Sequence, residues 1–65
     1  MRKLTERFLS FLLEKRQQAD QNSFTYLEYK DFDGYESAIA DLSIRGVIEK
    51  TNDIVGTIIV HIPKN

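Results

Sequence analysis

The fold is decided by one stretch of the chain, residues 35–50, which read YESAIADLSIRGVIEK. Its apolar residues follow the i, i+3, i+4, i+7 spacing of a single helix face: Tyr35, Ala38, Ile39 and Leu42. Gly46 is placed to end that helix, because a residue without a Cβ adopts the left-handed backbone of a helix terminus at little cost. The stretch therefore predicts an amphipathic helix that stops at Gly46 and continues into a β-strand.

The start of this helix is predicted by its capping residues. Asp33 is a favourable N-cap, and Glu36 follows three residues later, as in a capping box. Arg45 lies near the opposite end, where a positive charge is favoured by the helix dipole. We expect the helix to begin at Asp33.

Another helix is predicted upstream, over residues 4–19, with Thr5 as its cap and Leu4 and Leu9 as a hydrophobic staple. Its apolar residues cover an arc of about 200°, whereas a stripe of about 100° is enough to face one core. Leu9 and Leu13, at the edge of this arc, could therefore form the seam of a homodimer. The alternative is that later strands wrap around the helix and cover both of its flanks.

The other segments alternate between turns and strands. Polar turns are expected at residues 20–23 and 30–34, a strand at 24–29, and a hairpin with strands at 47–51 and 57–62 joined by 52–56. Pro63 and Lys64 should end the last strand. The fold class is therefore α+β, in the order α-β-α-β-β, as a single domain over residues 1–65.

The helix and hairpin together resemble the winged-helix family. The resemblance rests on Ala38-Ile39, on Leu42, and on Gly46-Val47-Ile48. It implies that residues 4–19 are the family's first helix, that 24–29 are its first strand and that 47–62 are the wing. The family's second helix has only residues 30–34 available, so we expect it to be missing or a single turn.

Composition and charge restrict the classes of function. The chain has 65 residues, no cysteine and a net charge of −1, whereas dedicated DNA-binding domains are usually basic. The charge is unevenly distributed: residues 1–19 carry five basic and two acidic residues (+3), residues 20–44 one and six (−5), and residues 45–65 three and two (+1). A domain this short has a small core, so self-association would add stability.

The sequence contains neither a signal peptide nor a run approaching the roughly 20 apolar residues of a membrane span. Together with the absence of cysteine, this predicts a cytoplasmic protein.

The residues needed for catalysis or cofactor binding are scarce. His61 is the only histidine, and the three glycines form no phosphate-binding loop. Asp31 and Asp33 could suggest a metal pair, but duty in a turn and a helix cap explains them better. We expect a non-enzymatic protein without metal or cofactor.

The acidic middle of the chain, rich in tyrosine, is the predicted surface for a protein partner. Tyrosine is enriched at binding hot spots, although Phe24, Phe32 and Tyr35 are better explained as core residues. The resemblance adds the outward face of the recognition helix. The predicted partner-binding residues are Tyr26, Glu28, Tyr29, Asp31, Glu36, Ser37, Ala40 and Asp41.

A second set of residues could contact nucleic acid. These are the basic residues of the first helix and two residues of the wing: Arg2, Lys3, Arg7, Lys15, Arg16, Lys50 and Asn52. Two hypotheses follow. The first is a regulator that modulates a transcription regulator or nucleoprotein complex through protein–protein contacts. The second is a winged-helix repressor that binds DNA directly.

Overall fold

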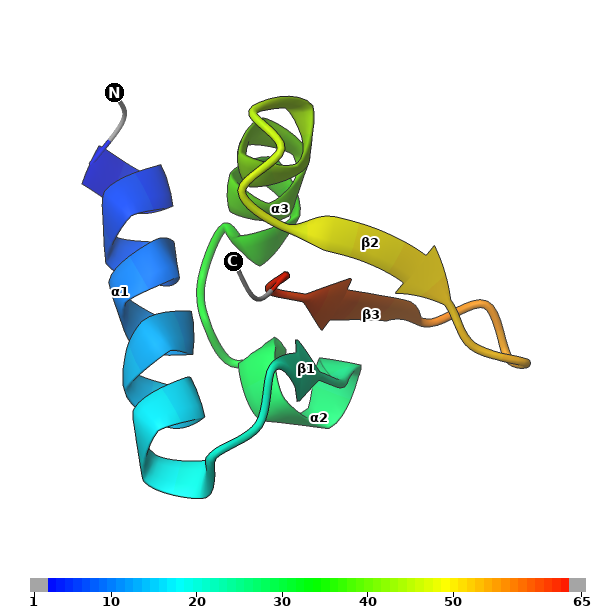
Figure 1. Cartoon of the computed structure of the whole chain (residues 1–65). Helices are drawn as coiled ribbons and strands as arrows, with labels where there is room; N and C mark the ends of the chain where they lie inside the picture. Colours follow the sequence, from blue (N-terminus) through cyan, green and yellow to red (C-terminus); the bar gives the residue numbers. More distant parts are fainter. Residues whose placement is uncertain (1–2, 64–65) are drawn as a thin grey trace.

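The computed structural model describes residues 3–63 of the chain (Figure 1). Its elements follow in the order α1 (Lys3–Ala19), β1 (Ser23–Phe24), α2 (Tyr26–Tyr29), α3 (Tyr35–Ile44), β2 (Glu49–Asn52) and β3 (Ile58–His61). Figure 1 shows α1 along one side of the molecule and the β2–β3 hairpin projecting away from it. The described residues thus form a mixed helix and strand structure, consistent with the predicted α+β class.

The three strands described form one antiparallel sheet in the order β1-β3-β2. In the central strand, Val60 is paired with Phe24 on one side and with Lys50 on the other. The predicted hairpin is confirmed, with β2 beginning two residues later than expected. Asp53 stabilises its turn, because its Oδ1 accepts hydrogen bonds from the backbone N–H groups of Val55 at 2.9 Å and Thr57 at 2.8 Å.

The hydrophobic core lies between α1, α3 and the sheet. Its buried members are Phe8, Leu12, Phe24, Tyr29, Ala38, Ile39, Leu42, Ile48, Val60 and Ile62. The predicted apolar face of α3 is therefore confirmed. Phe32 and Tyr35 are half-buried and pack against this cluster, which agrees with the interpretation of these aromatic residues as core.

The end of α3 is the predicted helix terminus at Gly46. The φ angle of Gly46 is 76°, in the left-handed region. The backbone N–H of Val47 donates to the carbonyl of Leu42 at 3.0 Å, and that of Gly46 donates to Ser43 at 3.1 Å. These two bonds make a Schellman motif, which satisfies carbonyls at the end of the helix and redirects the chain toward β2.

Two predicted helix starts are wrong. Gly34, with φ 84°, is the residue before α3, and α3 has no capping hydrogen bond from a side chain, so Asp33 does not cap it. Thr5 does not cap α1, because the helix already includes Lys3 and Thr5 is buried inside it. The proposed staple of Leu4 and Leu9 depended on that cap and is wrong with it.

The predicted strand at residues 24–29 is also wrong beyond Phe24. Strand β1 ends there, and Tyr26–Tyr29 form the one-turn helix α2. The cause is a capping interaction: the carboxylate of Glu28 accepts a hydrogen bond from the backbone N–H of Thr25 at 2.7 Å. A short second helix therefore exists, but before residues 30–34 rather than within them.

Candidate functional site

All three tyrosines of the chain gather at one place, where α2, the start of α3 and the start of β3 meet. The ring centroids of Tyr26 and Tyr29 are 6.0 Å apart, those of Tyr26 and Tyr35 5.9 Å, and those of Tyr29 and Tyr35 5.2 Å. The rings meet edge to face, which is a favourable aromatic geometry. Tyr26 is 41% exposed, whereas Tyr29 is only 1% exposed.

These tyrosines line a pocket of about 270 Å³. Its remaining walls come from Glu36 at the first turn of α3 and from residues 56–58, where the hairpin turn leads into β3. The hydroxyl of Tyr29 donates a hydrogen bond to the backbone carbonyl of Ile58, which ties α2 to the central strand. We call this cavity the tyrosine pocket.

Two hydroxyls of the tyrosine pocket, those of Tyr29 and Tyr35, have a raised pKa. Burial raises the pKa of Tyr29, and the neighbouring Tyr35, Tyr26 and Asp53 raise it further. Desolvation also raises the pKa of Tyr35, as do its hydrogen bond with Tyr26 and the charge of Glu36. The pocket therefore combines phenol hydroxyls, which donate and accept hydrogen bonds, with the carboxylate of Glu36 at its wall.

Three of the predicted partner-binding residues are engaged in contacts within the fold itself. Tyr29 is a core residue, so its assignment to a contact surface is wrong. The carboxylate of Glu28 is held by Thr25 and by the Nε2 of Gln21 at 2.6 Å. The hydrogen bond from the Thr25 backbone is the main cause that lowers the pKa of Glu28.

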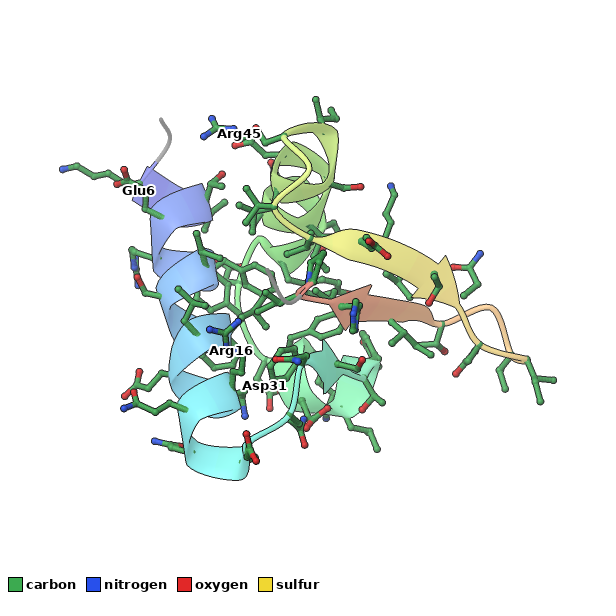
Figure 2. The ribbon with its side chains drawn as sticks, viewed as in Figure 1. Glu6, Arg16, Asp31 and Arg45 are labelled. Atoms are coloured by element: carbon green, nitrogen blue, oxygen red, sulfur yellow. The ribbon has the colours of Figure 1, made fainter. Side chains whose placement is uncertain are left out.

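Asp41 is the third of these residues. Its Oδ2 accepts a hydrogen bond from the buried Thr5 hydroxyl at 2.7 Å, and its Oδ1 lies 3.2 Å from the Nε of Arg45. Its side chain is only 23% exposed. The expectation of an outward-facing carboxylate is therefore wrong, because Asp41 joins α3 to α1. Arg45, at the end of α3 in Figure 2, is engaged by this carboxylate.

The other five predicted partner-binding residues do not form one surface. Tyr26 and Glu36 line the tyrosine pocket, and Ser37 and Ala40 are exposed on the following turns of α3. Asp31 is exposed but lies elsewhere, in a separate pocket that it shares with Arg7 of α1. The structure thus divides the predicted surface into an α3 face and a region beside α1.

The predicted nucleic-acid contacts are dispersed as well. Lys3 and Arg7 are exposed on α1, and Lys50 and Asn52 are exposed on β2, on the far side of the molecule (Figure 1). The half-buried Lys15 places its Nζ 5.1 Å from the centroid of the Phe11 ring. Arg2 lies outside the described residues. The residue set therefore does not form a continuous basic surface among residues 3–63.

The two leucines of the predicted dimer seam lie along a groove of about 420 Å³. Leu13 is 39% exposed, while Leu9 is half-buried and packs against the core. The other residues of the groove are Arg16, Gly46, Val47, Ile62 and Pro63. Residues after α3 and after β3 therefore flank this side of α1, yet they leave Leu13 accessible.

Several apolar residues are exposed that the sequence did not lead us to expect on the surface. Ile54 is fully exposed at the hairpin turn, and Leu27 is exposed on α2. Val55 in the turn and Ile44 at the end of α3 are each 86% exposed. A signal was present for three of them. Ile54 and Val55 interrupt a polar turn, and Ile44 falls outside the apolar face of its helix.

The histidine of β3 has a cross-strand partner. His61 shares a hydrogen bond of 2.8 Å between its Nδ1 and the Oγ of Ser23, its cross-strand neighbour. Within residues 3–63, no three histidine, cysteine, aspartate or glutamate side chains converge to form a possible metal site. None of the helices described there is both long and apolar enough to cross a membrane.

Comparison of the chain with protein-family models, with curated proteins and with solved structures finds no match.

Proposed function

We propose that the chain is a winged-helix-like, non-enzymatic regulatory domain that binds a protein component of a transcriptional or nucleoprotein complex. Two features support the winged-helix-like assignment. The elements follow the order α1-β1-α2-α3-β2-β3, and the wing-like hairpin pairs with a short first strand in the order β1-β3-β2.

The outward face of α3 is the observation that carries the proposal. Glu36, Ala40 and Ile44 recur every four residues, so they share one face of the helix, and all three are exposed. DNA-reading helices present cationic and amide side chains to bases and phosphates. An acidic, small and apolar face suits a protein surface better, because the carboxylate would meet phosphates with repulsion.

The charge at the end of α3 supports the same partner class. Arg45 follows directly after Ile44 at the end of α3, and it is bound to Asp41. An ion-paired arginine is less available for a phosphate, since binding would first have to displace the carboxylate. Ile44, next to it in sequence, is a large apolar side chain that would be buried by contact with a protein.

A photo-crosslinking residue at position 44 tests the proposal. We expect it to capture one defined protein of the complex in cells, whereas the same group at Gln17, exposed on α1, should not capture that protein. The variant Ile44→Glu should abolish co-purification of this protein while the chain stays folded. If no protein is captured through position 44 and the chain binds duplex DNA tightly, the proposal is contradicted.

Direct binding of duplex DNA is the second candidate function. Lys50 and Asn52 favour it, because they are exposed two residues apart and so lie on one face of the wing strand β2. Affinity should then fall steeply with salt, and Lys50→Ala should reduce the slope of log K against log salt by about 1. Absence of duplex binding at low salt would exclude this function.

The proposal includes a homodimer formed through the groove beside Leu13. Because Leu9 also packs in the core, Leu13→Glu alone is the cleaner test. Light scattering should give twice the chain mass for the parent and the chain mass for the variant. A folded variant with the same mass as the parent would rule out this seam.

A further inference from the structure

We propose that the tyrosine pocket binds an arginine side chain of the protein partner. The inference rests on the proposed function for the existence of a protein partner, and it adds the chemical group that the partner presents. The pocket adjoins the α3 face through Glu36, which belongs to both. A partner that covers α3 would therefore lie beside the pocket opening.

The aromatic walls suit a flat cation. Tyr26 and Tyr35 meet at 69°, so their rings form an angled wall against which a planar group can lie. Aromatic faces attract cations through their negative quadrupole, and guanidinium groups stack on them more readily than ammonium groups do. The exposed ring of Tyr26 is the accessible part of this wall, while Tyr29 supports it from inside.

The negative charge of the pocket favours a positively charged ligand. Glu36 contributes a carboxylate to the wall, and Asp53 lies close enough to influence the titration of Tyr29. No basic side chain lines the pocket among the described residues. An anion would be repelled by this arrangement, whereas an apolar side chain would leave the carboxylate without a charged partner.

The hydrogen-bonding groups favour arginine over lysine. A carboxylate accepts two parallel hydrogen bonds from one guanidinium, which a point-like ammonium cannot provide. Within residues 3–63, Glu36 has no ion-pair partner. Its carboxylate is therefore available for two parallel hydrogen bonds with one guanidinium. The volume of about 270 Å³ leaves room for a side chain that is stacked on Tyr26 and paired with Glu36.

Titration with a short glycine peptide carrying one central arginine tests the inference. The readouts are tyrosine fluorescence, which here reports only the pocket because the chain has no tryptophan, and amide NMR shifts. We expect shifts at Tyr26, Tyr35 and Glu36 and in residues 56–58. A matched peptide with citrulline, which keeps the shape but lacks the charge, should bind about tenfold more weakly. The lysine peptide should also bind more weakly.

Variants of the full chain assign the contacts. Glu36→Gln should weaken binding of the arginine peptide about tenfold, while Asp31→Asn, an exposed carboxylate in a different pocket, should leave it unchanged. Tyr26→Phe should keep most of the affinity because the ring face remains, whereas Tyr26→Ala should lose it. Tyr26, Asp31 and Glu36 are all exposed, so we expect each variant to stay folded, and circular dichroism checks this.

Equal binding of the arginine and citrulline peptides, or no shift in the pocket at saturating peptide, would overturn the inference. This failure is distinguishable from failure of the proposed function. If position 44 still captures its protein, only the arginine site is wrong. If the arginine peptide binds but no protein is captured through α3, the pocket stands and the proposed function falls.

Discussion

The two sides of α3 differ in how completely they are closed. Toward α1, the helix buries Ala38, Ile39 and Leu42, and Asp41 links it to the buried Thr5 hydroxyl. Toward solvent, it leaves Ile44 exposed. The packed side contributes to the stability of the fold, and the open side is the one that the proposed function assigns to a protein partner. Substitutions on the packed side should therefore lower the free energy of unfolding strongly. Substitutions on the open side should change it little.

The largest effect is expected in the core. Leu12 of α1 is fully buried, so Leu12→Ala should lower the free energy of unfolding by about 2–5 kcal/mol, through lost burial and the cavity left behind. Urea denaturation measures this loss as a lower midpoint. Leu27→Ala on α2 is the control, since that leucine is mostly exposed and should change the free energy by no more than about 0.5 kcal/mol.

The hydrogen bond between α1 and α3 should have the next largest effect. Thr5→Val keeps the side-chain shape but removes the donor to Asp41, and should cost about 1.5–3 kcal/mol because the acceptor is charged. A double-mutant cycle with Asp41→Asn measures the coupling by chemical denaturation. Thr51→Val, at an exposed position of β2, is the matched control. Additive effects of the two substitutions would show that the bond contributes nothing.

The turn from α3 to the hairpin should be moderately sensitive. At Gly46 the left-handed φ of 76° opposes any side chain, although the space around it is open. Gly46→Ala should therefore cost about 1 kcal/mol. Gly46→Asn should cost less, because asparagine tolerates this conformation better. Equal thermal midpoints for the parent and the alanine variant would contradict the importance of this helix terminus.

The cap of α2 predicts a pH dependence. The pKa of Glu28 is lowered in the folded state, so its contribution to stability is present above its unfolded value and is lost as the pH falls through the folded value. At about pH 7, Glu28→Gln should lower the free energy of unfolding by about 1 kcal/mol. The difference from the parent should shrink on acidification below pH 4.5, the ordinary value. A difference that does not change with pH would contradict the cap.

The smallest effect is expected at the hairpin turn. Ile54→Ser removes a fully exposed apolar side chain that supports no core contact, so the free energy of unfolding should stay within about 0.5 kcal/mol of the parent. Asp53→Ala, one residue earlier, removes the acceptor of two backbone hydrogen bonds and should cost more. Equal losses from both variants would show that Ile54 packs in the folded state.

Sequence reasoning was accurate where the pattern was long and local. The helix of residues 4–19, the apolar face of α3 and the stop at Gly46 follow from spacing and backbone sterics, and all three are present. The strand predicted at residues 24–29 was wrong, because the β-forming side chains there belong in part to a one-turn helix. A single turn has too few residues to show a period, so the better signal was the Thr25–Glu28 capping pair.

The candidate site was less predictable than the fold. Sequence reasoning predicted Tyr26 and Glu36 as partner-binding residues but could not place them in one pocket, because they come from different elements that meet only in the folded chain. It also read Asp41 as outward-facing. The Thr5 hydroxyl that donates a hydrogen bond to Asp41 belongs to a residue thirty-six positions away in the sequence. No local sequence pattern links these two residues.

The position of β2 at the border of the sheet has a consequence for solubility. Among the described strands, β2 has a neighbour only on the β3 side, so its other margin exposes backbone groups that could join a second chain. Every side chain of this strand is exposed, and Glu49 and Lys50 place opposite charges next to each other along it. Such charged borders resist the stacking of chains into fibres, so the molecule can keep an open strand without aggregating through it.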